Sequence, residues 1–155
     1  MIAERKIPLQ TILLAGLLVG TLDILSAFVD VYVNTGKNPL IVLNYIATGA
    51  FGKTDFTASN GGAAVGLLFH YIIAFAFTIL FFWLYTKSNF PSKNWVLTGI
   101  VYGLFIWAIM NFIVVPLSNV RTAPFTAFRL IKAALILIVM IGLPLSFIAG
   151  RFSKG

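Results

Sequence analysis

Five strongly polar side chains interrupt the long apolar runs of this 155-residue sequence: Asp23, Asp30, His70, Asn111 and Lys132. An ionisable group held inside a bilayer is costly and is by default a functional candidate. A carboxylate beside an imidazole can bind a proton, orient a ligand or join two helices as an ion pair. These five residues are therefore predicted to carry the chemistry, and the apolar segments around them must position them.

Four apolar stretches are long enough to cross a bilayer, which takes roughly 20 residues. They cover residues 9–33, 62–85, 95–117 and 126–149. The composition agrees, because 60% of the residues are hydrophobic and 10% are charged, whereas soluble domains carry about 25% charged residues. We expect one all-α transmembrane domain over residues 1–155, built as an antiparallel bundle of four helices.

The connection between the first two stretches carries signals of its own. Asn38 and Pro39 are typical of a helix start, and Gly49 of a helix stop. The enclosed segment, residues 39–48, is too short to span a bilayer. We expect a short helix that lies at the membrane surface or enters the membrane as a re-entrant turn.

The depths of the polar residues predict a shared site. With a rise of about 1.5 Å per residue, Asp23 and His70 lie roughly 15 and 12 Å below the outer ends of their helices. Asn111 and Lys132 lie about 9 Å below the outer ends of theirs. All fall in the outer half, so we expect a polar pocket that opens away from the cytoplasm. The alternative is that Asp23 and His70 only satisfy each other, with Asp30 and Lys132 near the headgroups.

Glycines recur at a spacing of four residues on three of the four predicted helices. This spacing lets helix backbones approach closely, the usual way to gain packing within a membrane. Packing inside one bundle is favoured over a dimer face or a ligand groove. The pairs are Gly16 with Gly20, Gly62 with Gly66, and Gly99 with Gly103.

The net charge of +7 comes from basic residues at the ends of the apolar runs. This distribution is typical of membrane anchoring and argues against a nucleic-acid partner. An excess of basic residues near short connections marks the cytoplasmic side, so we expect both termini in the cytoplasm. The residues on that side are Arg5, Lys6, Lys87, Lys93, Arg151 and Lys154, against Lys37, Lys53, Arg121, Arg129 and Lys132 on the other.

Several kinds of chemistry are not expected. The sequence has no cysteine and one histidine, which argues against a transition-metal site. It lacks a phosphate-binding glycine loop, a nucleophile elbow and a metalloprotease helix motif. We therefore expect no metal and no cofactor, and an enzymatic role is the less favoured one.

Several segments resemble a group of small bacterial inner-membrane proteins of unknown function, similar in layout to the YagU-like family. The matching segments are residues 14–23 (LAGLLVGTLD), 46–52 (IATGAFG) and 66–70 (GLLFH), with Tyr102 and Gly103 followed by Val115 and Pro116. The resemblance covers most of the chain through loose motifs. It implies four helices in a bacterial inner membrane and transfers no catalytic residue.

Three functions remain open at this point. The first is a polar pocket around Asp23 and His70 that binds or passes a small solute or a proton, for which so small a chain would need to form a homo-oligomer. The second is a membrane-embedded enzyme on a lipid-like substrate, with His70 as base and Asp23 orienting it. The third is a structural or partner-binding subunit in which the polar residues join helices. Membrane lipids are partners in each case.

Overall fold

The structure is a computed structural model that describes residues 7–87, 94–120 and 126–152. Some of the predictions concern other residues. The expected tight turn around Pro91 lies outside the described ranges. So do five of the basic residues used for the topology prediction, namely Arg5, Lys6, Lys93, Arg121 and Lys154.

Four membrane-length helical segments account for most of the described chain, which contains no strand in these ranges. The first two are α1 (Leu9–Thr35) and α3 (Asn60–Lys87). The third comprises α4 (Trp95–Ile109), η1 (Met110–Val114) and α5 (Val115–Leu117), and the fourth α6 (Ala127–Leu137), η2 (Ile138–Gly142) and α7 (Leu143–Phe152). Each is long and apolar enough to cross a membrane. The prediction of an all-α multi-pass membrane protein is confirmed.

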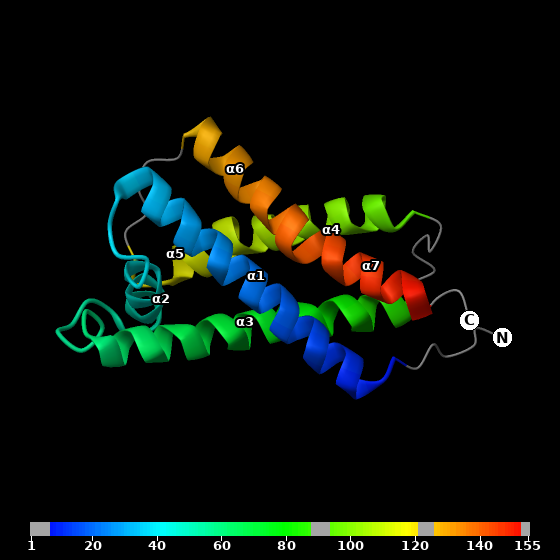
Figure 1. Cartoon of the computed structure of the whole chain (residues 1–155), viewed down its shortest axis with the longest axis horizontal. Helices are drawn as coiled ribbons and strands as arrows, with labels where there is room; N and C mark the ends of the chain where they lie inside the picture. Colours follow the sequence, from blue (N-terminus) through cyan, green and yellow to red (C-terminus); the bar gives the residue numbers. More distant parts are fainter. Residues whose placement is uncertain (1–6, 88–93, 121–125, 153–155) are drawn as a thin grey trace.

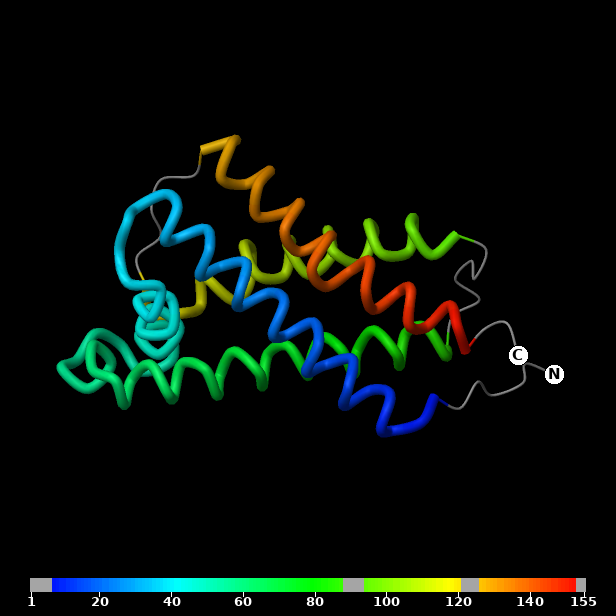
Figure 2. The backbone as a smooth tube through the Cα atoms, viewed as in Figure 1, coloured from blue at the N-terminus to red at the C-terminus, as the bar shows by residue number. Residues whose placement is uncertain are grey.

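The four segments cross one another at an angle (Figure 1). The blue helix α1 and the orange-to-red segment from α6 to α7 run diagonally in the view, across the nearly horizontal α3 and α4. The tube in Figure 2 shows the same arrangement without the ribbons. Leu9 and Phe152, the two ends of the helical chain, lie at the same end of the bundle. An even number of crossings produces this placement.

The first connection forms a short apolar helix, α2 (Ile41–Phe51), as expected. The predicted limits, residues 39–48, are wrong by two or three residues at each end. Asn38 holds Pro39 and Leu40 in a turn, because its Oδ1 accepts a hydrogen bond from the Leu40 N–H at 3.0 Å. Gly49 stays helical, and the helix ends where Gly52 takes a positive φ of 81°, a conformation that glycine adopts without steric cost.

Helix α2 packs against the N-terminal part of α3. Gly66 of α3 lies against the backbone of Leu43, so close that a Cβ on Gly66 would overlap the Leu43 carbonyl. The Asn44 side chain donates hydrogen bonds to the carbonyls of Thr57 and Ser59, at 2.7 and 2.8 Å. These contacts fix α2 to the segment that leads into α3.

Two π-helical turns, η1 and η2, each lie just before a proline. Pro116 follows η1 and Pro144 follows η2. A proline in a helix has no N–H to donate, and its ring crowds the carbonyl four residues earlier. The wider π turn accommodates both effects without ending the helix. The expected bends at Pro116 and Pro144 thus take the form of π turns.

The larger apolar core lies away from α2, where α3, α4 and α7 approach with α1. Aromatic rings from α3 fill much of it. The hydroxyl of Tyr102 donates to the Phe77 carbonyl at 2.5 Å, and the Ser146 hydroxyl donates to the Trp95 carbonyl at 2.6 Å. These two hydroxyls therefore find backbone acceptors on neighbouring helices, which avoids the cost of an unpaired polar group in hydrocarbon.

The contact between Gly66 and Leu43 predicts a large effect of one methyl group. We expect Gly66→Ala to destabilise the protein by about 1–3 kcal/mol, because the methyl must displace backbone. Gly49→Ala is the matched control, since its new Cβ would meet the Ser118 Cβ at 3.6 Å, an ordinary contact. Thermal unfolding in one detergent measures both variants. Equal stability of the two variants would contradict the close packing of α2 on α3.

Candidate functional site

The crossing of α1 and α3 brings two of the predicted site residues together. Gly20 of α1 faces Tyr71 and Ala74 of α3, and a Cβ on Gly20 would lie 3.0 Å from the Tyr71 ring. The absence of a side chain at Gly20 lets buried His70 reach the α1 backbone, with its Nε2 2.7 Å from the Gly20 carbonyl oxygen. A carbonyl only accepts, so Nε2 carries a proton and donates it.

Asp23 lies three residues beyond Gly20 on α1, about one helical turn from the carbonyl that His70 binds. Its carboxylate accepts no hydrogen bond from any residue within the described ranges. The one bond made to Asp23 uses its backbone carbonyl, which accepts from the Ser26 hydroxyl at 2.7 Å. The carboxylate therefore retains its capacity to bind a proton or a solute.

Two hydroxyls that sequence reasoning missed complete this crossing. Thr21 and Tyr71 share a hydrogen bond of 2.7 Å between Oγ1 and the phenolic oxygen. The Tyr71 ring also packs edge-on against His70, with 5.5 Å between centroids. The sequence did contain a signal for these hydroxyls. Thr21 lies two residues before Asp23 and Tyr71 directly follows His70, in helices already predicted to meet.

Asp30 and Lys132 form an ion pair between α1 and α6, with 2.5 Å between Lys132 Nζ and Asp30 Oδ1. Asp30 also accepts a hydrogen bond from Asn34 at 2.9 Å. The side chains of Lys132 and Asp30 are 31% and 35% exposed. The pair lies roughly 8 Å from the end of α1 and the start of α6, as the helix rise gives, which places it nearer the membrane surface than Asp23.

Asn111 is separate from these pairs. Its side-chain amide donates to the Trp107 carbonyl of its own helical segment at 2.8 Å. Within the described ranges it makes no hydrogen bond or ion pair to Asp23, Asp30, His70 or Lys132. The buried indole Nε1 of Trp107 also lacks a partner there. Among the five predicted residues the described structure thus forms one interhelical ion pair, Asp30 with Lys132. His70 bonds the Gly20 carbonyl, about one helical turn from Asp23, with no ion pair between Asp23 and His70 in the described ranges, and Asn111 is an isolated amide.

The six predicted packing glycines all make close contacts within the chain. Gly16 faces Phe75 and Gly20 faces Tyr71, both between α1 and α3. Gly62 and Gly66 face the segment before α3 and helix α2, so they do not bring α1 close to α3. Gly99 faces Leu143 and Gly103 faces Ile138 in the last membrane segment.

A pocket beside α2 is lined mainly by apolar side chains and by none of the five predicted residues. This pocket of about 280 Å³ lies between α2, α3 and the segment from Met110 to Val120, lined by side chains that include Tyr45, Phe69 and Val115. No cluster of three His, Cys, Asp or Glu residues that could hold a metal occurs within the described part of the chain.

We expect measurable coupling between Asp30 and Lys132. Partial exposure places the pair between exposed ion pairs, which contribute about 0.2–1 kcal/mol, and buried ones, whose disruption costs about 3–5 kcal/mol. A double-mutant cycle of Asp30→Asn and Lys132→Gln in unfolding free energy should give about 1–2 kcal/mol. Additive single effects would show that the pair contributes nothing.

A scan against protein-family models and searches of curated proteins and of solved structures found no match to this chain. The resemblance to small bacterial inner-membrane proteins therefore stays an expectation.

Proposed function

We propose that this multi-pass membrane protein binds a proton, or a small cationic solute in its place, at the Asp23–His70 pair. The observation that carries the proposal is the Asp23 carboxylate. It lies at membrane depth beside His70, yet it accepts no hydrogen bond from the described residues. A carboxylate in such surroundings gains a great deal by acquiring a proton or a cation.

The charges of the neighbouring groups support this choice. Lys132 compensates Asp30 in a direct ion pair, so the Asp30 carboxylate is not free to bind another cation. His70 uses its Nε2 proton for the Gly20 carbonyl, which leaves its charge state to depend on Nδ1. A proton can then reside on Asp23 or on His70, and the charge of the α1–α3 crossing changes when a proton enters or leaves.

The hydrogen bonds at the α1–α3 crossing link proton binding to the position of these two helices relative to each other. His70 holds α3 against Gly20, and Tyr71 holds α3 against Thr21. A change of charge between Asp23 and His70 alters the attraction between the same two helices. Proton binding would therefore shift the balance between arrangements of α1 and α3.

A structural role is the second candidate, because most of the polar contacts join different helices. Asp30 binds Lys132, Tyr102 binds Phe77 and Ser146 binds Trp95. In this case Asp23 and His70 serve only to hold α1 against α3. The two candidates differ in whether neutral substitutions at this pair remove an activity or only stability.

Proton flux into liposomes separates the candidates. The protein is reconstituted with a pH-sensitive dye inside, and a pH step is applied outside. We expect the wild type to dissipate the gradient faster than protein-free liposomes. Asp23→Asn and His70→Gln should each lose this flux, because each removes one site for the proton. Asp55→Asn, in the loop before α3, is the control and should keep the flux.

The same variants are compared for thermal stability, so that loss of folding is not mistaken for loss of function. Wild-type flux equal to that of protein-free liposomes would overturn the proposal. Flux that survives Asp23→Asn would also overturn it. A strongly destabilised single variant whose stability returns in the Asp23→Asn, His70→Gln double variant, with no flux in any protein, would favour the structural role.

We also propose that the membrane is a bacterial inner membrane with both termini in the cytoplasm. Basic residues at the helix ends support this orientation, including Lys87 and Arg151 in the last turns of α3 and α7. The chain has no cysteine, so single cysteines can be introduced without background. An impermeant thiol reagent added to intact cells should label Lys53→Cys and leave Ser88→Cys unlabelled. The opposite pattern would mean that the protein is inverted.

A further inference from the structure

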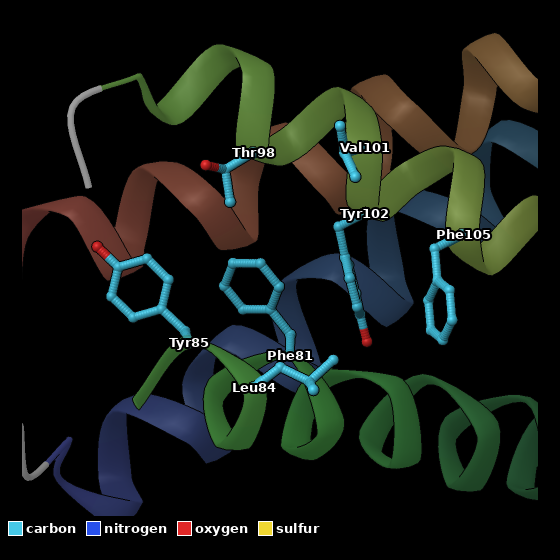
Figure 3. Close-up of a pocket in the computed structure, with 7 residues that line it drawn as sticks. All are labelled: Phe81, Leu84, Tyr85, Thr98, Val101, Tyr102 and Phe105. Carbon is cyan, nitrogen blue, oxygen red and sulfur yellow. The ribbon is translucent and has the colours of Figure 1, made fainter. Parts of the chain in front are cut away.

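A groove of about 230 Å³ lies between α3 and α4, at the end of the bundle away from α2 (Figure 3). Its floor consists of aromatic rings, with Phe81 and Tyr102 4.8 Å apart between centroids. Val101 and Phe105 of α4 form its other wall and are 43% and 39% exposed. Both helices are membrane-spanning segments, so the groove opens to the bilayer.

The spacing of the groove is fixed by a hydrogen bond beneath it. Tyr102 of α4 donates to the Phe77 carbonyl of α3 at 2.5 Å. The rings of Tyr102 and Phe81 lie between α3 and α4 and hold the two helices about the width of a ring apart. The backbones of α3 and α4 therefore come close to each other at few points. The groove is therefore preformed, and an occupant need not separate the helices.

One polar group lies at the end of this apolar groove. The Tyr85 side chain is 7% exposed, and its hydroxyl has no hydrogen-bond partner among the residues that the structure describes. In Figure 3 the hydroxyl points toward the end of the bundle where α3 ends and α4 begins. A phenol with a mostly buried ring prefers a partner for its O–H, and this hydroxyl remains accessible at the groove end, so it marks where a polar part of an occupant would lie.

Positive charge lies at the same end. Lys87, in the last turn of α3, is two residues beyond Tyr85, about 3 Å along the helix and about 200° around it. Its ammonium reaches the end of the groove through the long, flexible lysine stem, which lets the charge lie away from its own Cα. Arg151, in the last turn of α7, lies at this end as well. Tyrosine and lysine at a helix end are typical of headgroup depth. An occupant would have its apolar part in the groove and its acidic part near Lys87.

We propose that the groove between α3 and α4 is a binding site for one anionic phospholipid. An acyl chain lies over Phe81, Tyr102 and Phe105. The Tyr85 hydroxyl donates a hydrogen bond to an ester or phosphate oxygen, and the negative headgroup lies by Lys87. Only a molecule of the bilayer or a second copy of the chain reaches this groove, and the combination of a free hydroxyl and a lysine at its end matches a lipid headgroup. This site is distinct from the Asp23–His70 pair.

The test uses the full chain in phosphatidylcholine liposomes that contain a small fraction of phosphatidylglycerol with a diazirine on one acyl chain. After illumination, adducts are mapped by mass spectrometry. We expect adducts concentrated on Phe81, Val101 and Phe105. Phe112 and Phe128, which are 71% and 73% exposed elsewhere on the bundle, serve as the measure of contact with bulk lipid.

Val101→Trp fills the groove with an indole ring, a side chain that is also compatible with a lipid-facing position. It should lower groove adducts about tenfold, the effect of losing roughly two buried methylene groups. Val96→Trp is the matched control, since Val96 is on the same helix at 39% exposure and does not line the groove. It should leave groove adducts unchanged. Equal melting temperatures of the two variants show that both fold.

Two further variants test the polar end. Tyr85→Phe should lower groove adducts about two- to tenfold, the range for one hydrogen bond. Lys87→Gln should remove the preference for phosphatidylglycerol over a phosphatidylcholine probe with the same diazirine. Adducts spread evenly over all exposed residues, or adducts insensitive to Val101→Trp, would overturn the site. Protein–protein cross-links through the groove would overturn it as well, because a second copy would then occupy it.

Discussion

A polar group inside a bilayer has no water to bond, so the protein itself must supply its partner. The arrangement of the helices follows from this requirement. His70 reaches the backbone of α1, Tyr102 reaches the backbone of α3, and Ser146 reaches that of α4. Each bond joins two membrane segments at one depth, which apolar contacts alone would leave free to slide. Among the groups that remain without a described partner, which also include the Trp107 indole N–H, the Asp23 carboxylate and the Tyr85 hydroxyl are the two on which the proposals rest.

Close backbone approach is the second condition that these bonds need. A hydrogen bond from an imidazole to a carbonyl on another helix forms only where no side chain separates the two, and Gly20 supplies that gap. Gly103 does the same between α4 and the last segment, where a Cβ would lie 2.6 Å from the Ile138 Cα. Glycine thus permits the crossings, and the polar bonds then set their register.

Much of this fold could be predicted from the length and spacing of apolar residues. The four spans and the short helix follow from run length, and their limits differ from the prediction by a few residues because helices end at particular turns, such as the one at Gly52. Helix rise alone placed Asp23 and His70 at one depth. It could not show that Asp30 turns to Lys132 while Asn111 bonds its own helix, because those directions depend on which neighbour each face meets. The groove beside Tyr85 could not be predicted from the sequence either, since it depends on the distance between α3 and α4.

The π turn η2 divides the last membrane segment into two arms. The α7 arm is anchored in the core through Leu145, Ser146 and Ala149, whereas the α6 arm contains no fully buried residue in the range Ala127–Leu137. A π turn before a proline has weaker hydrogen bonding than the α-helix on either side, so the angle between the two arms depends on contacts made outside the turn. Lys132 lies on the α6 arm. Its ion pair with Asp30, together with the packing of α6 on α4, therefore fixes that angle.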